Sequence, residues 1–258
     1  MTDPGAGPAI SSPRHPLVLE ASRLRRSRAR RESGRTLVEG PILVAAAATG
    51  GCRFDRIFGL ASDVVGREVA DEVGCPFVVV DAAALAKVAT TQHPQSPVAV
   101  VTIPEESITP GKRALVAWGV GDPGNCGTLI RTAAAFGYDY FAGPGAAETW
   151  SPKVLRAAAG AHFHTGIGRA ATLEQLGAGR VLVAAVARGG TPPGPLPGNA
   201  AILVGSEPHG LDAEVVAACG VAVTIPMAEG SESLNAAVAG AIVAFLGASG
   251  PGANLTPS

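Results

Sequence analysis

The stretch ALVAWGVGDPGNCGTLIRTAAAFGYDYFAG, residues 114–143, decides the fold class of this chain. Its first apolar run predicts a buried strand, its middle part predicts a helix that ends at Gly137, and its last part predicts a second strand. The same alternation continues toward the C-terminus, in strand-like runs at 180–187, 200–207 and 221–227 and helix-like runs at 151–163, 212–220 and 233–248. This pattern predicts an α/β domain with a parallel sheet covered by helices on both faces.

The first hundred residues show a second, smaller alternation. A basic helix is expected at 17–34 and strands at 54–60, 76–81 and 96–104, with helical runs between them. The polar stretch PEESITPGK, residues 104–112, is typical of a linker. We therefore expect a disordered N-terminus (1–14), a small α/β domain (15–103), a linker (104–112), a larger domain (113–248) and a flexible tail (249–258).

The composition excludes several classes of protein. The chain has 258 residues, of which 47% are hydrophobic and 16% are charged, as expected of a globular protein. No apolar run reaches the roughly 18 residues that a membrane helix needs, and the N-terminus has no apolar signal-peptide core. The four cysteines are scattered without a CxxC pair, which argues against a zinc site or a disulfide framework. We expect a cytoplasmic protein without a metal.

The net charge of −1 hides a cluster of arginines near the N-terminus. Only Glu32 offsets them within their stretch. Such a cluster is typical of a surface that binds phosphates, although a solvated helix face is the alternative. The candidate RNA-binding residues are Arg23, Arg25, Arg26, Arg28, Arg30, Arg31 and Arg35.

Residues 119–124 match the G-x-G-x-x-G pattern of dinucleotide-binding loops. Pro123 removes a backbone N–H that such a loop would donate to pyrophosphate. A ribose-binding carboxylate is also missing from the end of the next strand, because Glu148 comes too late. We therefore regard a nicotinamide-dependent enzyme as a weak alternative.

Three motifs carry the stronger signal: DPGNCGTLIRTAAAFG at 122–137, LVGSEPHGL at 203–211 and IPMAEGSESLNAAVAGAIVAF at 225–245. Each joins the end of a strand to the start of a helix, so all three can meet at one edge of a parallel sheet, where α/β folds bind ligands. Together they resemble the signatures of the SpoU/TrmH class of RNA ribose 2′-O-methyltransferases, within the SPOUT superfamily.

The resemblance implies a catalytic domain with a deep trefoil knot, a homodimer, and S-adenosylmethionine as the methyl donor. The N-terminal half resembles, more loosely, the ribosomal-protein-like substrate-binding domain of enzymes that act on 23S rRNA, including the thiostrepton-resistance type. The catalytic residues implied are Asn125, Arg131, Glu207, Ser233 and Asn235. The cofactor-binding residues implied are Leu203, Gly205, Gly210, Ile225, Met227 and Leu234.

Local sequence adds expectations for some of these residues. Asn125 is expected to be the N-cap of its helix with Arg131 reaching out from the second turn, and Ser233 is a plausible cap for the last helix. A guanidinium is a poor base because its pKa lies above about 12. Arg131 is therefore expected to hold a phosphate and to stabilise the developing 2′-oxyanion.

The resemblance predicts S-adenosylmethionine-dependent 2′-O-methylation of a ribose, with 23S rRNA as the expected substrate. A non-catalytic RNA-binding or ribosome-assembly factor on the same fold is the alternative from another class, and a tRNA ribose methyltransferase is the alternative substrate. The 2′-hydroxyl is the group that distinguishes RNA from DNA. The RNA would be bound by the arginine-rich domain and methylated by the larger domain.

Overall fold

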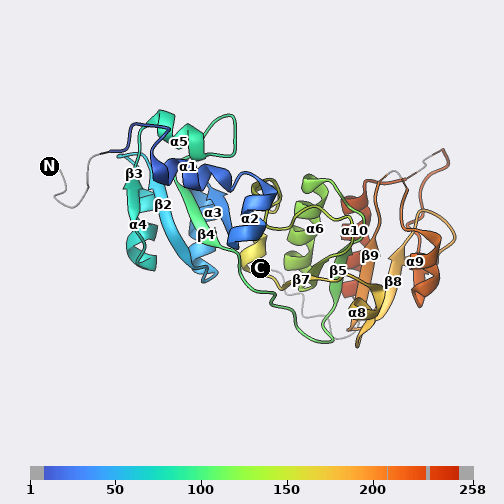
Figure 1. Cartoon of the computed structure of the whole chain (residues 1–258). Coiled ribbons are helices and arrows are strands. Elements are labelled where there is room, and N and C mark those ends of the chain that lie inside the picture. The colour runs from blue at the N-terminus through green and yellow to red at the C-terminus, as the bar shows by residue number, and fades with distance from the viewer. Residues whose placement is uncertain (1–8, 208, 231–232, 250–258) are drawn as a thin grey trace. The chain divides into compact units, whose positions relative to one another are not determined.

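The computed structural model describes residues 9–207, 209–230 and 233–249, and the chain divides into two compact units. One unit contains residues 1–105 together with 150–163, and the other contains 106–149 together with 164–258 (Figure 1). Most of the predicted disordered N-terminus and of the predicted flexible tail lies outside the described residues.

The N-terminal unit is built on a mixed four-stranded sheet of order β1-β4-β2-β3. Its strands are β1 (Arg35–Glu39), β4 (Val98–Thr102), β2 (Phe54–Gly59) and β3 (Phe77–Val79). Strand β4 is antiparallel to both of its neighbours, whereas β2 and β3 are parallel. Both β1 and β2 therefore end at the edge of the sheet where β4 begins.

Alternating side chains of these strands supply two cores, one on each face of the sheet. Leu37 and Phe58 pack under α1 (Pro16–Arg23) and α5 (Ala82–Val88). Val38 and Ile57 point the other way and pack under α3 (Pro41–Thr49) and α4 (Val64–Val73). The sheet is thus covered on both sides.

The basic stretch forms two helices where the sequence predicts one. Helix α1 ends at Arg23 and α2 (Ser27–Ser33) starts after a turn in which Arg26 N–H bonds to the carbonyl of Arg23. Leu24, in this turn, is buried in the core, and its carbonyl accepts a 2.8 Å hydrogen bond from the guanidinium of Arg30. Burial of Leu24 and this hydrogen bond stabilise the break between α1 and α2. Helix propensity alone does not predict this break.

Helix α7 (Pro152–Ala157) and the short 3₁₀-helix η1 (Ala161–Phe163) belong to the N-terminal unit, although the sequence assigns them to the larger domain. Leu155 is buried in the same core as Val38, and the Thr36 hydroxyl donates to the Trp150 carbonyl at 2.7 Å. The chain therefore leaves the second unit after Thr149 and returns at His164.

The second unit contains a parallel six-stranded sheet, as the sequence predicts, in the order β10-β8-β9-β5-β6-β7. The strands are β5 (Ala114–Ala117), β6 (Asp139–Ala142), β7 (Ile167–Arg169), β8 (Val181–Ala185), β9 (Ala200–Val204) and β10 (Val221–Val223). The short strand β7 and helix α8 (Leu173–Gly177) were not predicted. From β5 the chain continues toward the β7 edge of the sheet, and from β9 it continues toward the β10 edge. These two adjacent strands therefore form a topological switch point.

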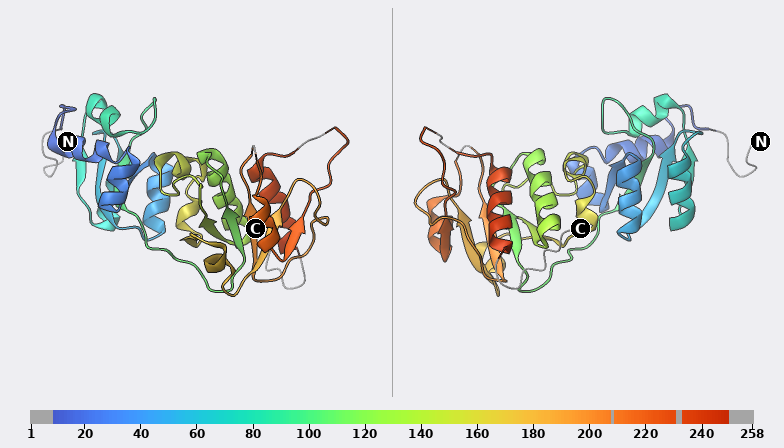
Figure 2. Two further views of the ribbon diagram at one scale, coloured as in Figure 1. Left: turned by 45° about the vertical axis from the view of Figure 1, so that its right-hand side comes forward. Right: turned by 180° about the vertical axis from the view of Figure 1, so that it is seen from behind.

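Helices cover both faces of this sheet, which confirms the α/β prediction. Helices α6 (Pro123–Phe136) and α10 (Ala236–Ala248) lie side by side on one face (Figure 2). A Cβ on Gly240 would lie 2.6 Å from Leu129, so the absence of a side chain there lets α10 approach α6 closely. Helices α8 and α9 (Ala213–Ala218) contribute Leu176 and Val215 to the core of the other face.

The second half of the predicted linker is fixed to this unit. Ser107 N–H bonds to the Ile167 carbonyl at 3.1 Å. The buried Asp139 carboxylate accepts bonds from Thr109 N–H at 2.7 Å and from Lys112 Nζ at 2.8 Å. The segment after Glu106 therefore forms part of the edge of the larger sheet.

Candidate active site

The first motif places Asn125 inside the first turn of α6. The Asp122 side chain accepts a 2.8 Å hydrogen bond from Asn125 N–H and is therefore the N-cap, followed by Pro123 at the first helical position. The prediction that Asn125 is the N-cap is wrong, and its amide is free to point toward the edge of the sheet. Asp122 also puts a carboxylate where the pyrophosphate of a dinucleotide would bind, which argues against the nicotinamide alternative.

The three motifs meet in one hydrogen-bonded network at the switch point between β5 and β9. Asn125 Nδ2 donates to Glu207 Oε1 at 2.9 Å. Asn235 Nδ2 donates to Asn125 Oδ1 at 2.9 Å and also to Glu207 Oε1. Three of the predicted catalytic residues are thus in direct contact, although 110 positions separate Asn125 from Asn235.

Asn235 is also the N-cap of α10, a role that the sequence analysis gave to Ser233. Its Oδ1 accepts from Ala237 N–H at 3.0 Å and from Val238 N–H at 3.1 Å. Because this oxygen is committed to the helix, the NH₂ group has to face Glu207 and Asn125. The start of α10 therefore fixes the orientation of both amides.

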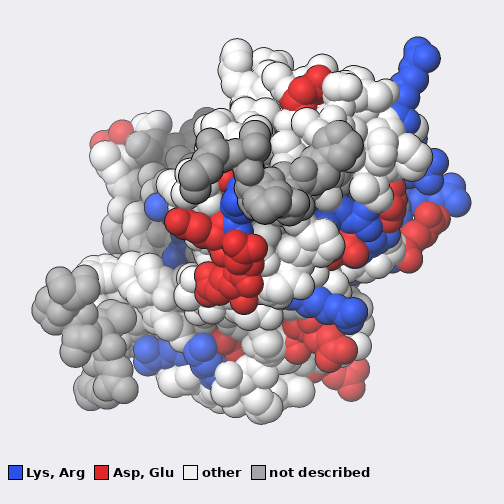
Figure 3. Space-filling model, turned by 90° about the vertical axis from the view of Figure 1, so that its left-hand side faces the viewer, with Lys and Arg blue, Asp and Glu red and all other residues white. Residues whose placement is uncertain are grey.

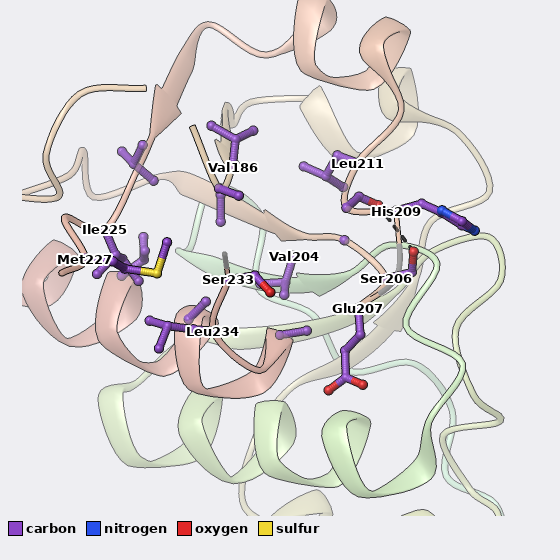
Figure 4. A pocket seen from close by; sticks show the side chains of 18 residues that line it. Val186, Val204, Ser206, Glu207, His209, Leu211, Ile225, Met227, Ser233 and Leu234 are labelled. Carbon is purple, nitrogen blue, oxygen red and sulfur yellow. Dashed lines mark hydrogen bonds between the residues drawn. The ribbon is translucent and has the colours of Figure 1, made fainter. Parts of the chain in front are cut away.

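Glu207 is held at the edge of a cavity of about 420 Å³. Its carboxylate points toward α6, away from the apolar walls (Figure 4). These walls are formed largely by Val186, Val204, Val223, Ile225, Met227, Leu234 and Val243. Five predicted cofactor residues line this cavity, namely Gly205, Gly210, Ile225, Met227 and Leu234, and Ser233 lines it as well.

Leu203 is the exception among the predicted cofactor residues. Its side chain is fully buried on the opposite face of the sheet, in the core with Val116 and Phe141. Since side chains alternate along a strand, the next residue, Val204, lines the cavity instead. The sequence analysis also missed residues 185–187 at the end of β8, which only the strand order could have placed beside β9.

A tight loop closes one side of the cavity. Ser206 and Gly210 exchange backbone hydrogen bonds of 3.1 and 2.8 Å, and Gly210 has a φ of +70°, which glycine adopts without strain. A Cβ on Gly205 would collide with the carbonyl group of Gly210. Gly205 is thus required by the loop itself, whereas the resemblance implied for it only a role in cofactor binding.

Arg131 is not part of the network. It lies on an exposed face of α6, whereas Asn125 is buried, as their separation of six residues predicts. No hydrogen bond or ion pair joins Arg131 to another residue in the described parts of the chain. Its guanidinium is available to a ligand from outside the chain.

The seven predicted RNA-binding arginines differ in accessibility. Arg30 is 4% exposed, and Arg35 forms ion pairs with Glu20 at 3.1 Å and with Asp55 at 3.3 Å. The accessible arginines are Arg23, Arg25, Arg26, Arg28 and Arg31, of which Arg28 pairs with Glu32. On the face drawn in Figure 3, Lys and Arg side chains lie among Asp and Glu side chains.

Other reactive groups play no part in the site. Burial raises the pKa of the Cys126 thiol, which lies in the first motif, and so keeps it protonated and unreactive.

Within residues 9–207, 209–230 and 233–249, no cluster of His, Cys, Asp and Glu could hold a metal ion. No helix of these segments is long and apolar enough to span a membrane.

Residues 112–245 match the model of the SpoU rRNA Methylase family. The chain belongs to this family. Residues 15–99 match the MRM3-like substrate binding domain. The SpoU match covers all three motifs, and the second match covers most of the N-terminal unit, including the arginine cluster.

Relatives of the SpoU family extend over nearly the whole chain. The 23S rRNA (guanosine(2553)-2′-O)-methyltransferase RlmP of Bacillus subtilis is 31% identical over 92% of this chain and 97% of its own. The crystal structure of an AdoMet-bound rRNA methyltransferase from Sinorhizobium meliloti is 25% identical, covers 93% of this chain and 97% of its own, and has a TM-score of 0.81. Both likenesses include the N-terminal unit as well as the second one.

Proposed function

We propose that this protein transfers a methyl group from S-adenosylmethionine to the 2′-hydroxyl of a ribose in 23S rRNA. The observation that carries the proposal is the Asn125–Glu207–Asn235 network beside an apolar cavity at the switch point of the sheet. Membership of the SpoU family and the likeness to RlmP support the reaction and the class of substrate.

The cavity fits an adenosyl group bound to a cationic sulfur. Its volume lies in the range of about 300–1,000 Å³ that is usual for small-molecule sites, and its walls offer apolar surface to a planar base. Glu207 is the only carboxylate among the described residues that line it, and a negative charge favours a nearby sulfonium. The candidate cofactor residues are those that line the cavity.

Bound S-adenosylmethionine supplies a methyl group already activated by its sulfonium, so the protein needs no nucleophile of its own. The hydroxyl loses its proton to solvent as the new C–O bond forms and the S–CH₃ bond breaks. The chain's part is to position the hydroxyl and to stabilise the negative charge that develops on its oxygen as the proton leaves. The network holds Glu207 in one orientation, and Arg131 holds a phosphate beside the target ribose. Ser233, at the rim of the cavity, contacts the substrate or the cofactor.

A homodimer would cover apolar surface that the second unit exposes. Val238 is 46% exposed and Phe245 is 50% exposed on α10, and the Phe245 ring lies 5.6 Å from the ring of Phe136 on α6. We propose that a second copy packs on this face of α6 and α10. Accessible arginines of α1 and α2 would bind phosphates of the RNA, and the protein would act in the cytoplasm.

We also propose a knot in the C-terminal segment. Helix α10 packs against α6, and Gly247 accepts a 3.1 Å hydrogen bond from Leu196 N–H in the loop between β8 and β9. A Cβ on Gly247 would lie 2.8 Å from Leu196, so this loop lies close against the helix, as a knot would require. The proposed domain boundaries are 15–103 and 113–248. Residues 150–163 fall within the second range but belong to the N-terminal unit.

The test is methyl transfer in vitro. Unmethylated 23S rRNA and total tRNA are incubated separately with the protein and labelled S-adenosylmethionine, and 2′-O-methyl positions are mapped. A single methylated nucleotide in 23S rRNA, absent with the Asn125→Ala variant, is expected. Labelling of tRNA alone would overturn the substrate, and cofactor binding without transfer to either RNA would favour the non-catalytic alternative.

A further inference from the structure

Glu39, at the end of β1, is a buried carboxylate with four hydrogen-bond donors. It is 5% exposed. One oxygen accepts from Thr90 N–H at 2.7 Å and from the Thr90 hydroxyl at 2.6 Å, and the other accepts from the Thr91 hydroxyl and from Gln95 N–H at 3.2 Å. Burial by itself raises the pKa of Glu39, but these bonds outweigh it and hold the pKa below its usual value of 4.5.

The four bonds fix both ends of the loop 90–96, which leads into β4. The loop's far end is held a second time, because Ser96 bonds to Asp63 and accepts a 3.1 Å hydrogen bond from Leu60 N–H. Between these anchors, the side chains of Gln92, His93, Pro94 and Gln95 are all exposed. The protein thus holds a rigid loop whose side chains face solvent.

Two basic side chains flank this loop on the side of Thr90, whereas the Asp63 carboxylate bonds to Ser96 at its far end. Lys87 is exposed on the last turn of α5, three residues before Thr90. Arg156 of α7 donates one guanidinium N–H to the Thr90 hydroxyl, which leaves further donors on the same group. The carboxylate at the centre of the loop, Glu39, is buried and its oxygens are occupied. The loop therefore offers cations, amides and an imidazole to a partner.

We propose that residues 90–96, with Lys87 and Arg156, form an RNA-contacting surface, and that Glu39 is its positioning residue. The inference rests on the proposed function, which supplies RNA as the substrate. Lysine and arginine suit phosphates, and the Gln92 and Gln95 amides with the His93 ring suit the edges and faces of unpaired bases. The match to a substrate-binding domain over residues 15–99 supports a nucleic-acid partner for this unit.

This surface is separate from the arginine cluster. Arg35 begins β1 and Glu39 ends it, so the two surfaces lie toward opposite ends of a strand about 13 Å long, at about 3.3 Å per residue. A flexible, unpaired segment of RNA would be held at the loop, while the cluster contacts backbone phosphates elsewhere.

Glu39→Gln tests the positioning role with almost no change in shape. Each carboxylate oxygen accepts one backbone N–H, from Thr90 or from Gln95. An amide can serve only one of them, because its NH₂ group then faces the other N–H in either orientation. The loop should be released at one end, which hydrogen exchange of the Thr90 and Gln95 amides would report.

The experiment measures methyl transfer by the full-length protein, with a 23S rRNA transcript as the probe. Glu39→Gln, Lys87→Gln and the double variant Gln92→Ala/His93→Ala should each raise KM for the RNA about three- to tenfold, which corresponds to the loss of one or two weak contacts. The turnover rate and the affinity for S-adenosylmethionine should stay unchanged. Lys87→Gln should also flatten the dependence of log affinity on log salt by about 0.7–0.9.

Arg169→Gln is the matched control, since Arg169 is exposed on β7 of the second unit, outside both the loop and the arginine cluster. An equal rise in KM for the control would show only a general effect of charge and would overturn the inference. Unchanged KM values in all loop variants, with an active wild type, would overturn it while leaving the proposed function intact. An inactive wild type that does not bind the transcript would overturn both.

Discussion

Replacing Asn235 separates its two roles, because its oxygen caps α10 and its NH₂ group holds Asn125 and Glu207. Asn235→Ala removes both roles. Asn235→Asp keeps the cap, since aspartate caps helices as well as asparagine, but replaces the donor by a second carboxylate beside Glu207. The pair of variants therefore distinguishes loss of helix stability from loss of the network.

The expected magnitudes follow from these contacts. Asn235→Ala should lower the free energy of unfolding by about 1 kcal/mol, the usual cost of losing an N-cap, whereas Asn235→Asp should leave the capping contribution in place. Both variants should slow methyl transfer by about a hundredfold, the typical effect of a small misplacement in an active site. Affinity for S-adenosylmethionine should change little, because Asn235 does not line the cavity.

The assay is single-turnover transfer of labelled methyl groups to 23S rRNA, combined with calorimetric titration of the cofactor and urea denaturation. In Asn235→Asp, mutual repulsion raises the pKa of the two adjacent carboxyls, and a protonated carboxyl can again donate a hydrogen bond. This variant should therefore recover part of its rate as the pH falls toward about 6, relative to wild type at the same pH. A wild-type rate for Asn235→Asp at neutral pH would refute the role of the network.

Four further results are expected. Arg131→Ala should reduce the rate about 10²–10³-fold without affecting stability or cofactor affinity, as for loss of one preorganised charge contact; activity within a few-fold of wild type would remove it from the mechanism. Gly205→Val should lower both stability and cofactor affinity in calorimetry, because the new side chain collides with Gly210 and opens the loop; a stable variant with normal affinity would contradict this. Deleting residues 1–111 should yield an aggregation-prone fragment in size-exclusion chromatography, because Leu155 loses its core, whereas a soluble dimer would show that α7 finds another partner. Replacing the four accessible arginines other than Arg28, which pairs with Glu32, with Gln should weaken RNA binding and flatten its salt dependence by up to about 0.7 per lost contact, with an unchanged slope as the contrary outcome; the set is Arg23, Arg25, Arg26 and Arg31.

The sequence predicted the parallel sheet of the second unit because its strands are apolar and its motifs lie where strands end. Three residues far apart in the chain, Asn125, Glu207 and Asn235, were singled out by resemblance, and the structure brings them into contact. Periodicity could not have shown this, since polar residues at strand ends look alike until the order of the strands is known.

The errors have local causes. Aspartate, asparagine and serine all cap helices, so the sequence could not choose Asp122 over Asn125 or Asn235 over Ser233. Arg30 looks like its neighbours in sequence, yet it is buried because it bonds to the carbonyl of Leu24 at the break between two helices. Glu39 gave no signal, because its four donors lie more than 50 positions away.

The excursion of residues 150–163 has a consequence for how enzymes of this kind can exchange domains. A chimera that replaces only residues 1–105 would place a foreign sheet against the native α7, whose Leu155 is 1% exposed in the core beside Val38. The N-terminal unit is therefore discontinuous in sequence. A chimera that receives this unit from another protein should also receive that protein's own copy of the segment between Thr149 and His164. A single crossover point between the two units would separate residues 1–105 from residues 150–163 and so divide the N-terminal unit.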